Sequence, residues 1–483
     1  MNAELKDVKK VIPITPVESE PDEEGELISL YAAHEKIYPR SVTGMFSNWR
    51  WIMVWVTQII FYGLPWIEWG QRQAVMFDLS VRRFYIFGLV LYPQDFIYLT
   101  GMLIIAALSL FLFTAVAGRL WCGYACPQTV YTEIFLWFEK LVEGDRAARI
   151  RRDEGPMTAE KFGRKVVKHF LWIAFALYTG FTFVGYFAPI RELASDILKN
   201  NMSTWGYFWV FFYGFATYGN AGFMREQVCK HMCPYARFQS VMFDKDTLIV
   251  TYDAERGEPR GARSKKADLT KLNLGACVDC SLCVQVCPTG IDIRKGLQYE
   301  CIGCGACADV CDTVMDKVGY PRGLVKYSTE NAMKNKWTQQ QTLRHVFRPR
   351  ILAYSGILLA IILAIMVSLF TRTPFKVDVV RDRGVMARVV DAGTTENVYR
   401  LQVMNATESD QRYRLSVEGL PGLVLTSEDT VSVHSTEART IPVRVQLPFE
   451  GASPGSHEIH FTIESLDSPG KLIEKSTFIV PKN

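Results

Sequence analysis

Long apolar runs alternate with charged stretches along this chain, and they predict a membrane domain. A helix needs roughly 20 apolar residues, with a range near 17–25, to cross a bilayer. Tryptophans lie near the ends of several runs, as aromatic anchors do at membrane interfaces. Five runs are long enough to span, at residues 51–67, 96–117, 170–190, 207–224 and 351–370. We therefore expect a multi-pass α-helical transmembrane bundle of five spans.

Beyond residue 373 the pattern changes to strict alternation of apolar and polar residues, which predicts β-strands. The runs are separated by turns rich in Gly, Pro, Asp and Ser, and this spacing is typical of a sandwich of immunoglobulin-like size. The segment contains no cysteine, so an inter-sheet disulfide is excluded. The alternating positions are Tyr399, Leu401 and Val403; Tyr413, Leu415 and Val417; Ile441, Val443, Val445 and Leu447; and Ile459, Phe461 and Ile463.

Lysine and arginine in the short loops predict the orientation, because these residues are enriched in cytoplasmic loops. Segment 118–168 holds ten of them, segment 68–95 three and segment 191–206 two. Segments 118–168 and 225–350 should therefore be cytoplasmic. Five spans then leave the N-terminus inside and residues 371–483 in the periplasm of a bacterium, with the chain in its inner membrane.

These patterns divide the chain into five expected parts. No cleavable signal peptide is apparent, since the first apolar run begins only near residue 51. A net charge of +4 gives no reason to expect a nucleic-acid partner. The parts are a cytoplasmic tail (1–47), a four-span membrane domain (48–244), a cytoplasmic α+β ferredoxin domain (245–345), a fifth transmembrane helix (346–372) and a periplasmic all-β domain (373–483).

Eight of the 12 cysteines form two tandem motifs of the bacterial two-cluster ferredoxin type. A [4Fe–4S] cube needs four thiolates, and in such ferredoxins three come from one tight run while the fourth crosses over from the other. Gly303 and Gly305 would let the second loop bend around its cube. Structural zinc is the alternative, but zinc ribbons space their cysteine pairs widely. We expect one cluster on Cys277, Cys280, Cys283 and Cys311, and another on Cys301, Cys304, Cys307 and Cys287.

The other four cysteines form two Cys-x-x-x-Cys-Pro motifs, each at the cytoplasmic end of a predicted span and followed by an apolar-faced helix. A four-residue step would place both thiols of a motif on one face of a helical turn. The motifs look like copies of one hairpin unit, so their thiols could face one another. Soft thiolates favour Cu(I), zinc or iron–sulfur species, whereas the alternative is that they are merely buried small side chains. The candidate redox or copper thiols are Cys122, Cys126, Cys229 and Cys233, with His231 and Met232 as weaker candidate ligands.

Several other redox chemistries find no support in the sequence. No Cys-x-x-Cys is followed by His, which excludes c-type haem attachment. No Gly-x-Gly-x-x-Gly opens a helix after a strand, so a nicotinamide or flavin site of Rossmann type is not expected.

In this arrangement the chain resembles the FixG/CcoG/RdxA group, accessory proteins for assembly of the cbb-type cytochrome c oxidase. The resemblance covers nearly the whole chain, from the segment Lys36–Phe46 through both Cys-x-x-x-Cys-Pro sites and the twin ferredoxin motif to the β-tail. It implies reduction of Cu(II) to Cu(I) for copper insertion, with Cys122, Cys126, Cys229 and Cys233 as the copper or redox thiols. It also implies copper-handling proteins and oxidase subunits as partners, together with a cytoplasmic electron donor that the sequence does not identify.

Three functions are therefore open at this point. The first is a metal reductase, and so an oxidoreductase, that serves oxidase assembly. The second is an electron conduit between a cytoplasmic donor and a quinone or periplasmic redox partner. The third is an assembly scaffold in which the clusters only shape the fold. Two adjacent clusters exceed what a fold requires, which favours the first two.

Overall fold

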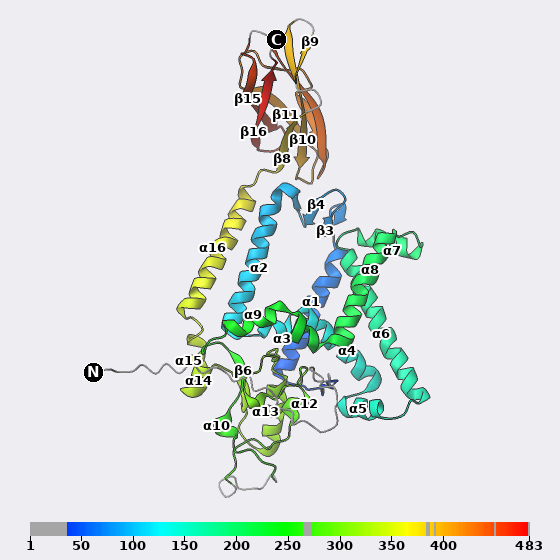
Figure 1. Cartoon of the computed structure of the whole chain (residues 1–483), viewed down its shortest axis with the longest axis vertical. Coiled ribbons are helices and arrows are strands. Elements are labelled where there is room, and N and C mark those ends of the chain that lie inside the picture. The colour runs from blue at the N-terminus through cyan, green and yellow to red at the C-terminus, as the bar shows by residue number, and fades with distance from the viewer. Residues whose placement is uncertain (1–35, 264–272, 383–386, 391–392, 449–450, 482–483) are drawn as a thin grey trace, which may run out of the picture. The chain divides into compact units, whose positions relative to one another are not determined.

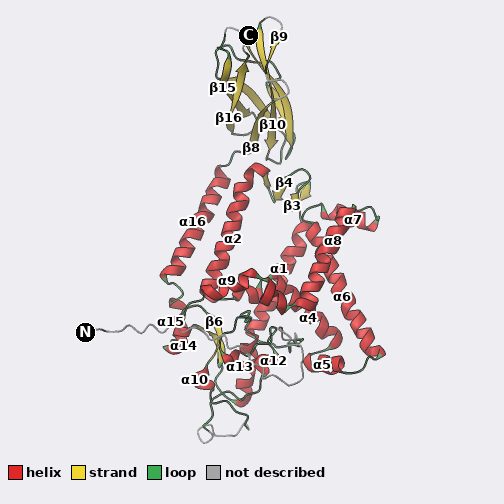
Figure 2. Ribbon diagram, in the orientation of Figure 1, coloured by secondary structure: helices red, strands yellow, loops and turns green. Residues whose placement is uncertain are grey.

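A computed structural model gives the fold (Figures 1 and 2), and it describes residues 36–263, 273–382, 387–390, 393–448 and 451–481. Residues 1–35 of the predicted tail (1–47) therefore lie outside the described residues. Helices make up the part up to Thr371, apart from small sheets, and β-strands make up the rest.

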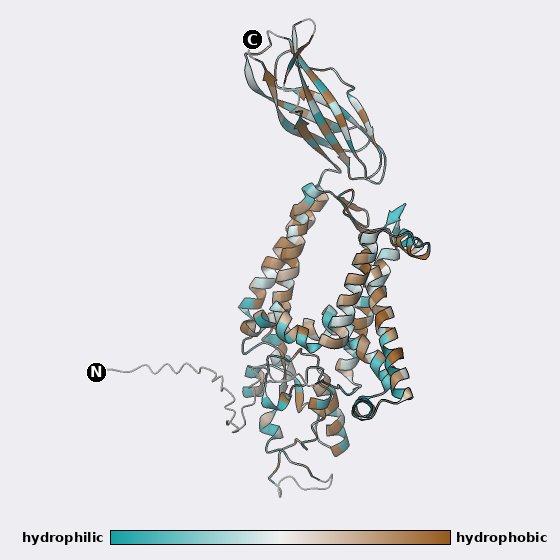
Figure 3. Ribbon diagram, turned by 45° about the vertical axis from the view of Figure 1, so that its right-hand side comes forward, coloured by the Kyte–Doolittle hydropathy of each residue, from teal (hydrophilic) through white to brown (hydrophobic). Residues whose placement is uncertain are grey.

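Within the described residues, three helices are long and apolar enough to cross a membrane: α2 (Phe96–Ala117, preceded by the 3₁₀ turn Pro93–Asp95), α6 (Ala159–Val184) and α16 (Pro349–Thr371). Only 6% of the most apolar window of α2 and of α16 is buried. Hydrophobic residues make up most of both helices (Figure 3), as in helices that face lipid. The chain is thus a multi-pass membrane protein.

α2 and α16 lie where hydropathy predicts them, whereas α6 is shifted. The prediction placed this span at 170–190, but the helix starts eleven residues earlier. The Thr158 side chain accepts a hydrogen bond from the Lys161 backbone N–H and so caps the start, and the helix ends before Gly185. The polar first turns of α6 carry too many charges to be recognised by hydropathy alone.

The other two predicted spans are helical but less regular. α1 (Met45–Gly63) covers most of 51–67 and ends in a 3₁₀ turn (Leu64–Trp66). α8 (Thr204–Thr217) continues as the π-helix η3 (Tyr218–Met224). Both carry many exposed aromatic and aliphatic side chains.

Short elements connect these helices. Two small antiparallel sheets follow α1, and amphipathic helices follow α2 and η3. They are β1 (Glu68–Trp69), β2 (Arg72–Gln73), β3 (Val75–Asp78), β4 (Arg83–Ile86), β5 (Leu89–Leu91), α3 (Leu120–Tyr124), α4 (Pro127–Glu143), α5 (Arg146–Glu154), α7 (Ile190–Leu198), η4 (Val228–Met232) and α9 (Pro234–Met242).

Buried charges hold α4, α5 and the end of η3 together. The Glu139 carboxylate, 1% exposed, lies 2.7 Å from the Arg225 guanidinium and 2.6 Å from that of Arg149. One turn on, Glu143 lies 3.1 Å from the Lys168 ammonium of α6. Because an unpaired buried charge is costly, these pairs fix how the four segments pack.

The ferredoxin segment is built around a two-stranded antiparallel ladder and two helices. Val250 pairs with Tyr327 across the ladder, and Met315 and Leu324 are almost fully buried beneath it. Its elements are β6 (Ile249–Tyr252), α10 (Ala254–Gly257), α12 (Leu282–Gln285), η5 (Ile293–Lys295), α13 (Ala306–Val318), β7 (Val325–Ser328), α14 (Glu330–Lys334) and α15 (Gln339–Arg344).

The C-terminal part is a β-sandwich, as the alternation predicts. Tyr399, Leu401 and Val403 are buried on one sheet and face Leu415 and Phe461 on the other. One sheet contains β8 (Phe375–Arg381), β9 (Arg388–Val390), β10 (Thr394–Asn405), β12 (Val424–Leu425) and β14 (Ala438–Pro448). The second contains β11 (Gln411–Glu418), β13 (Thr430–Val433), β15 (Gly455–Ser465) and β16 (Lys471–Val480).

Candidate iron–sulfur and thiol centres

The eight ferredoxin cysteines surround two small neighbouring cavities. The first cavity is lined by Cys277, Cys280, Cys283 and Cys311. The second is lined by Cys287, Cys301, Cys304 and Cys307, with Cys283 at the boundary between the two. Each cavity therefore has a complete set of four thiols, three from one motif and one from the other. This donor set fits a [4Fe–4S] cube, and the groups are those expected from the spacing.

The two cysteine loops have the same backbone conformation. Gly303 and Gly305 take positive φ of 65° and 74°, and the equivalent Asp279 and Ser281 take 54° and 53°. A left-handed backbone costs non-glycine residues roughly 1–2 kcal/mol. The first loop adopts this conformation without glycine, and an ion pair with Arg294 stabilises Asp279 there. Conformation, and not glycine content, is what the two loops share.

The two Cys-x-x-x-Cys-Pro motifs also have matching local structure. Four residues before the first cysteine of each, Gly118 (φ 54°, ψ −114°) and Arg225 (φ 39°, ψ −111°) break the preceding helix. Cys126 and Cys233 then occupy the N-cap positions of α4 and α9, with proline at the first helical position. The internal repeat predicted from sequence is present in the fold.

The expectation that both thiols of a motif share one helical face is wrong. Cys122 lies in α3 and Cys229 in the π-helix η4, whereas Cys126 and Cys233 start the next helices. The chain bends between the two cysteines because an N-cap residue takes an extended conformation.

Thiols from the two halves of the repeat nevertheless lie near one another, because Cys122 and Cys126 each interact electrostatically with a cysteine of the second motif. Burial, together with the proximity of Cys126, raises the pKa of Cys122 to about 12 and that of Cys229 to about 11. The pKa of Cys126 is raised by burial and by nearby Cys233. A metal bound here has to displace these protons. In the described part of the chain, no three Cys, His, Asp or Glu side chains are grouped for a single ion.

His231 and Met232 are placed differently from the thiols. Both are exposed, Met232 by 58% of its surface. Their position gives no support to the weaker ligand prediction.

Gly123, between the two cysteines of the first motif, touches the second ferredoxin loop. A Cβ at this position would lie 2.8 Å from the carbonyl oxygen of Gly303 and 3.0 Å from Cα of Cys304. Cys122 itself packs against the buried group that contains Ile302 and Cys304. The thiol centre and the second cluster loop are therefore in van der Waals contact.

Arg119 joins the second cluster loop and α9 at this contact. Its guanidinium, in a residue only 7% exposed, donates hydrogen bonds to the backbone carbonyls of Tyr299, of Cys301 (3.2 Å) and of Ala236 in α9 (2.9 Å). Neither Gly123 nor Arg119 was expected at the site. The sequence offers one hint to them, which is that both residues lie in or next to the first Cys-x-x-x-Cys-Pro motif. Their contact with the ferredoxin loop is long-range and has no sequence signature.

Three family models match the chain. Residues 224–330 match a 4Fe-4S dicluster domain, residues 99–143 match a 4Fe-4S binding domain, and residues 365–481 match the IG-like fold at the C-terminal of FixG. The second match includes the first Cys-x-x-x-Cys-Pro motif.

Curated relatives align over most of the chain. The nitrogen fixation protein FixG of Rhizobium meliloti is 36% identical, covering 91% of this chain and 94% of the relative. Protein RdxB of Cereibacter sphaeroides is 40% identical over 86% of this chain and 87% of its own length. Protein RdxA of the same organism is 39% identical over 82% and 84%. With its ferredoxin loops, its membrane helices and its β-sandwich, this chain belongs to the FixG/RdxA/RdxB family of membrane iron–sulfur proteins.

Proposed function

We propose that this chain reduces Cu(II) to Cu(I) at the four thiols Cys122, Cys126, Cys229 and Cys233, for copper insertion into a cbb-type cytochrome c oxidase. The eight ferredoxin cysteines would hold the two [4Fe–4S] clusters in the assignment given above. When bound, the clusters supply single electrons. Each Cu(II) ion takes one electron and becomes Cu(I), and one cluster returns to its oxidised state.

The contact of Gly123 with the Gly303–Cys304 backbone is the observation that carries this proposal. A glycine allows the thiol motif to approach the cluster loop without an intervening side chain. Arg119 stabilises the same contact, because its guanidinium donates hydrogen bonds to the carbonyl of Cys301 in the cluster loop and to that of Ala236 in α9. The chain thus positions a soft-ligand site directly beside a one-electron centre.

The thiols suit the product of the reaction. Thiolates are soft ligands and select Cu(I) over harder ions. The thiols come from two matched motifs, and thiolates drawn from these motifs would hold the reduced ion while it awaits transfer. The copper donor, the copper acceptor and the oxidase subunits are the proposed partners, and no nucleic acid is among them.

Five spans in a bacterial inner membrane fit this function best. Arg119 follows α2 and contacts Cys301, so an even number of crossings must separate them. α6 supplies one crossing, and α8 with η3 would supply the other. Phe46 at the start of α1 also meets this loop, 2.6 Å from a Cβ position at Gly305. α1 must then cross as well, because α2 crosses between it and Arg119.

The positive loops support a cytoplasmic location of the ferredoxin segment. The N-terminus lies on the same side, and the β-sandwich beyond α16 lies in the periplasm. The five parts predicted from the sequence would then be the functional divisions of the chain.

The match of residues 99–143 to a 4Fe-4S binding domain favours a second candidate for the same thiols. Four converging cysteines are also the ligand set of a third cluster. In that case the thiol centre would be a relay, and the protein a conduit to a further acceptor. Iron content distinguishes the copper-reductase proposal from the third-cluster proposal. Two cubes give about eight iron atoms per chain, and three give about twelve.

A double substitution tests the proposal. Cys122→Ala/Cys229→Ala should keep about eight irons per chain and the ferredoxin signals, yet lose Cu(II) reduction by the dithionite-reduced protein. Cu(I) is measured with a colorimetric chelator under anaerobic conditions. Undiminished Cu(II) reduction in this variant would rule out the thiols as the site.

A further inference from the structure

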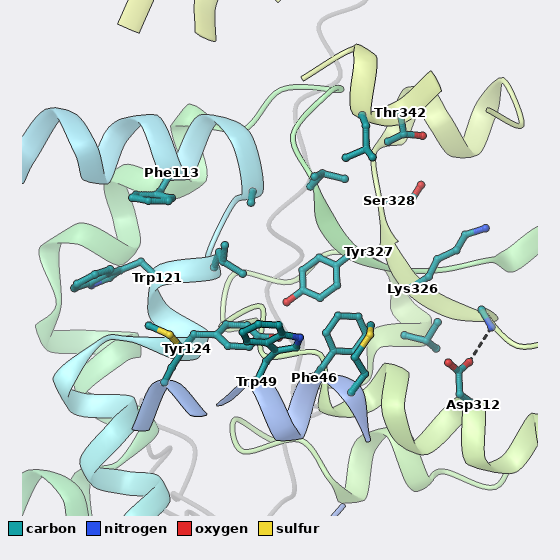
Figure 4. Close-up of a pocket in the computed structure, with 18 of the residues that line it drawn as sticks. Phe46, Trp49, Phe113, Trp121, Tyr124, Asp312, Lys326, Tyr327, Ser328 and Thr342 are labelled. Atoms are coloured by element: carbon teal, nitrogen blue, oxygen red, sulfur yellow. Dashed lines mark hydrogen bonds between the residues drawn. The ribbon is translucent and has the colours of Figure 1, made fainter. Parts of the chain in front are cut away.

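A large apolar cavity, of about 890 Å³, lies beside the cluster loops and takes no part in the proposed copper chemistry. Its walls come from the start of α1, the last turn of α2, α3, β7 and α15. A cavity of this size, lined mainly by aromatic and aliphatic side chains with few polar groups, is typical of small-molecule sites. Figure 4 shows the rings of Phe46, Trp49, Tyr124 and Tyr327 gathered on one side of it.

The cavity can be reached from the lipid. Phe113 and Ala117, in the last turn of the membrane helix α2, form part of its wall. Trp49 and Leu343, also in the wall, are more than half exposed. Tryptophan at such a position is typical of a membrane interface. The occupant should therefore be a lipid-soluble molecule.

Residues in the wall of the cavity adjoin cysteines of both proposed clusters. The Tyr327 hydroxyl donates a hydrogen bond to the Gly303 carbonyl, and the Tyr124 hydroxyl donates one to the Cys304 carbonyl at 3.3 Å. Asp312, which directly follows Cys311 of the other cavity, also lines it. The Tyr124 and Tyr327 side chains would thus lie between a molecule in the cavity and the second cluster loop, and Asp312 is the sequence neighbour of a ligand in the first set.

The polar groups of the cavity suit a flat ring with two oxygens. Lys326 and the Ser328 hydroxyl, both in the wall, can each donate a hydrogen bond to a carbonyl oxygen. Lys326 and Asp312 lie toward the side away from Phe113 and Trp121 (Figure 4), where protons can exchange with water. The aromatic walls can stack on a ring, and the α2 side can hold an apolar tail.

We propose that this cavity binds an isoprenoid quinone of the membrane and lets it exchange electrons with the two clusters. A quinone reduced here takes up two electrons, one from each cluster, and two protons from water, and leaves as a quinol. The reverse reaction releases the same electrons and protons. The direction follows the potential difference, and the site does not depend on copper reduction.

Binding is tested first, with a photoreactive azido-ubiquinone on the full-length protein in lipid nanodiscs. Cross-links should fall on the segments 42–53, 113–125 and 325–343, and excess decyl-ubiquinone should abolish them. Trp49→Ala, which removes one wall, and Thr342→Trp, which fills the cavity, should each lower labelling about tenfold. Trp55→Ala is the matched control, because Trp55 is an exposed tryptophan on the same helix outside the cavity.

Electron exchange is then followed by stopped-flow absorption. Dithionite-reduced protein, freed of excess reductant, is mixed anaerobically with decyl-ubiquinone. Reoxidation should saturate with quinone concentration in the wild type and in Trp55→Ala, and it should be about tenfold slower at low quinone in the two cavity variants. Equal iron content in all four proteins checks that they fold.

Unsaturable reoxidation at the same rate in all four proteins, or cross-links outside the cavity that a phospholipid displaces equally well, would overturn the quinone site. The proposed copper reduction can be disproved independently of the quinone site. Cys122→Ala/Cys229→Ala should reoxidise normally with quinone, so a loss of Cu(II) reduction alone leaves the quinone site standing.

Discussion

At the scale of single residues, a glycine without a side chain lets the first Cys-x-x-x-Cys-Pro motif lie against the second cluster loop. Gly123 is buried, and the backbone of the second cluster loop fills the space where its Cβ would lie. The closest atoms are backbone, so they cannot move aside as a flexible side chain would.

Gly123→Ala should therefore increase the distance between the first Cys-x-x-x-Cys-Pro motif and the second cluster loop. We expect a loss of about 1–3 kcal/mol in the free energy of unfolding, as for other overpacked positions, and slower reoxidation of the reduced protein by Cu(II). Gly356→Ala is the control, since Gly356 lies within α16 with open space around it. Stopped-flow absorption and thermal unfolding measure the two effects. Equal rates and stabilities in both variants would show that the contact is unimportant.

At the scale of the elements, charged residues inside the fold decide how helices pack beside the thiols. Glu139 joins α4 to α5 through Arg149 and to the end of η3 through Arg225. Arg225 itself has a strained positive φ, and its ion pair offsets that strain. The second Cys-x-x-x-Cys-Pro motif begins four residues later.

Glu139→Gln should destabilise the protein by about 3–5 kcal/mol, because it leaves two buried guanidinium groups without their carboxylate. Glu160→Gln removes an exposed pair with Arg164 and should change stability by less than about 1 kcal/mol. Thermal unfolding followed by circular dichroism in detergent measures both. A loss no larger than that of the control would contradict a structural role for the buried pair.

The Glu139 effect should depend on pH in a defined direction. Burial alone would raise its pKa, but the Arg225 guanidinium, with Arg149 and Lys168, outweighs burial and lowers it. The stability from this carboxylate is then complete above the unfolded glutamate pKa of about 4.3, and it is lost as pH falls through the folded value. The difference in Tm between wild type and Glu139→Gln should be constant above that pH and shrink below it.

Much of this organisation follows from local sequence pattern. The bounds of α2 and α16 agree with hydropathy to within two residues, and the strands β10, β11, β14 and β15 agree with the alternation. These elements are predictable because each faces one kind of surroundings, either lipid or a single hydrophobic core, and those surroundings determine which positions are apolar. The eight ferredoxin cysteines line two cavities in the groups that their spacing predicts, because three cysteines of each group lie in one short loop.

The remaining features depend on contacts between distant segments. Arg119 and Arg149 count toward cytoplasmic loops in a sequence reading, yet both are buried and paired. The bend between Cys122 and Cys126 arises because α4 starts anew at Pro127. Gly123 has no local signature, since its partner lies some 180 residues away in the chain. Hydropathy also misplaces the start of α6, whose first turns are charged.

At the scale of the whole molecule, contacts between segments determine how often the chain must cross the membrane. In the proposed topology, α1 and α8 cross together with the three clearly apolar helices, because Arg119 and the start of α1 both reach the ferredoxin loop. The β-sandwich would then emerge on the side opposite the clusters.

Truncated fusions to alkaline phosphatase test this topology, because the enzyme is active only outside the cytoplasm. Fusions after Asn200 and Asn483 should be active, and those after Glu154 and Arg263 inactive. Activity after Arg263 would mean that α8 does not cross.

Iron and EPR measurements on anaerobically purified protein, before and after addition of Cu(II), test the central claim most directly. We predict about eight irons per chain, signals of two reduced [4Fe–4S] clusters after dithionite, and their disappearance as Cu(II) becomes Cu(I). Colourless protein that contains zinc or no iron, or reduced clusters that Cu(II) leaves unchanged, would contradict it.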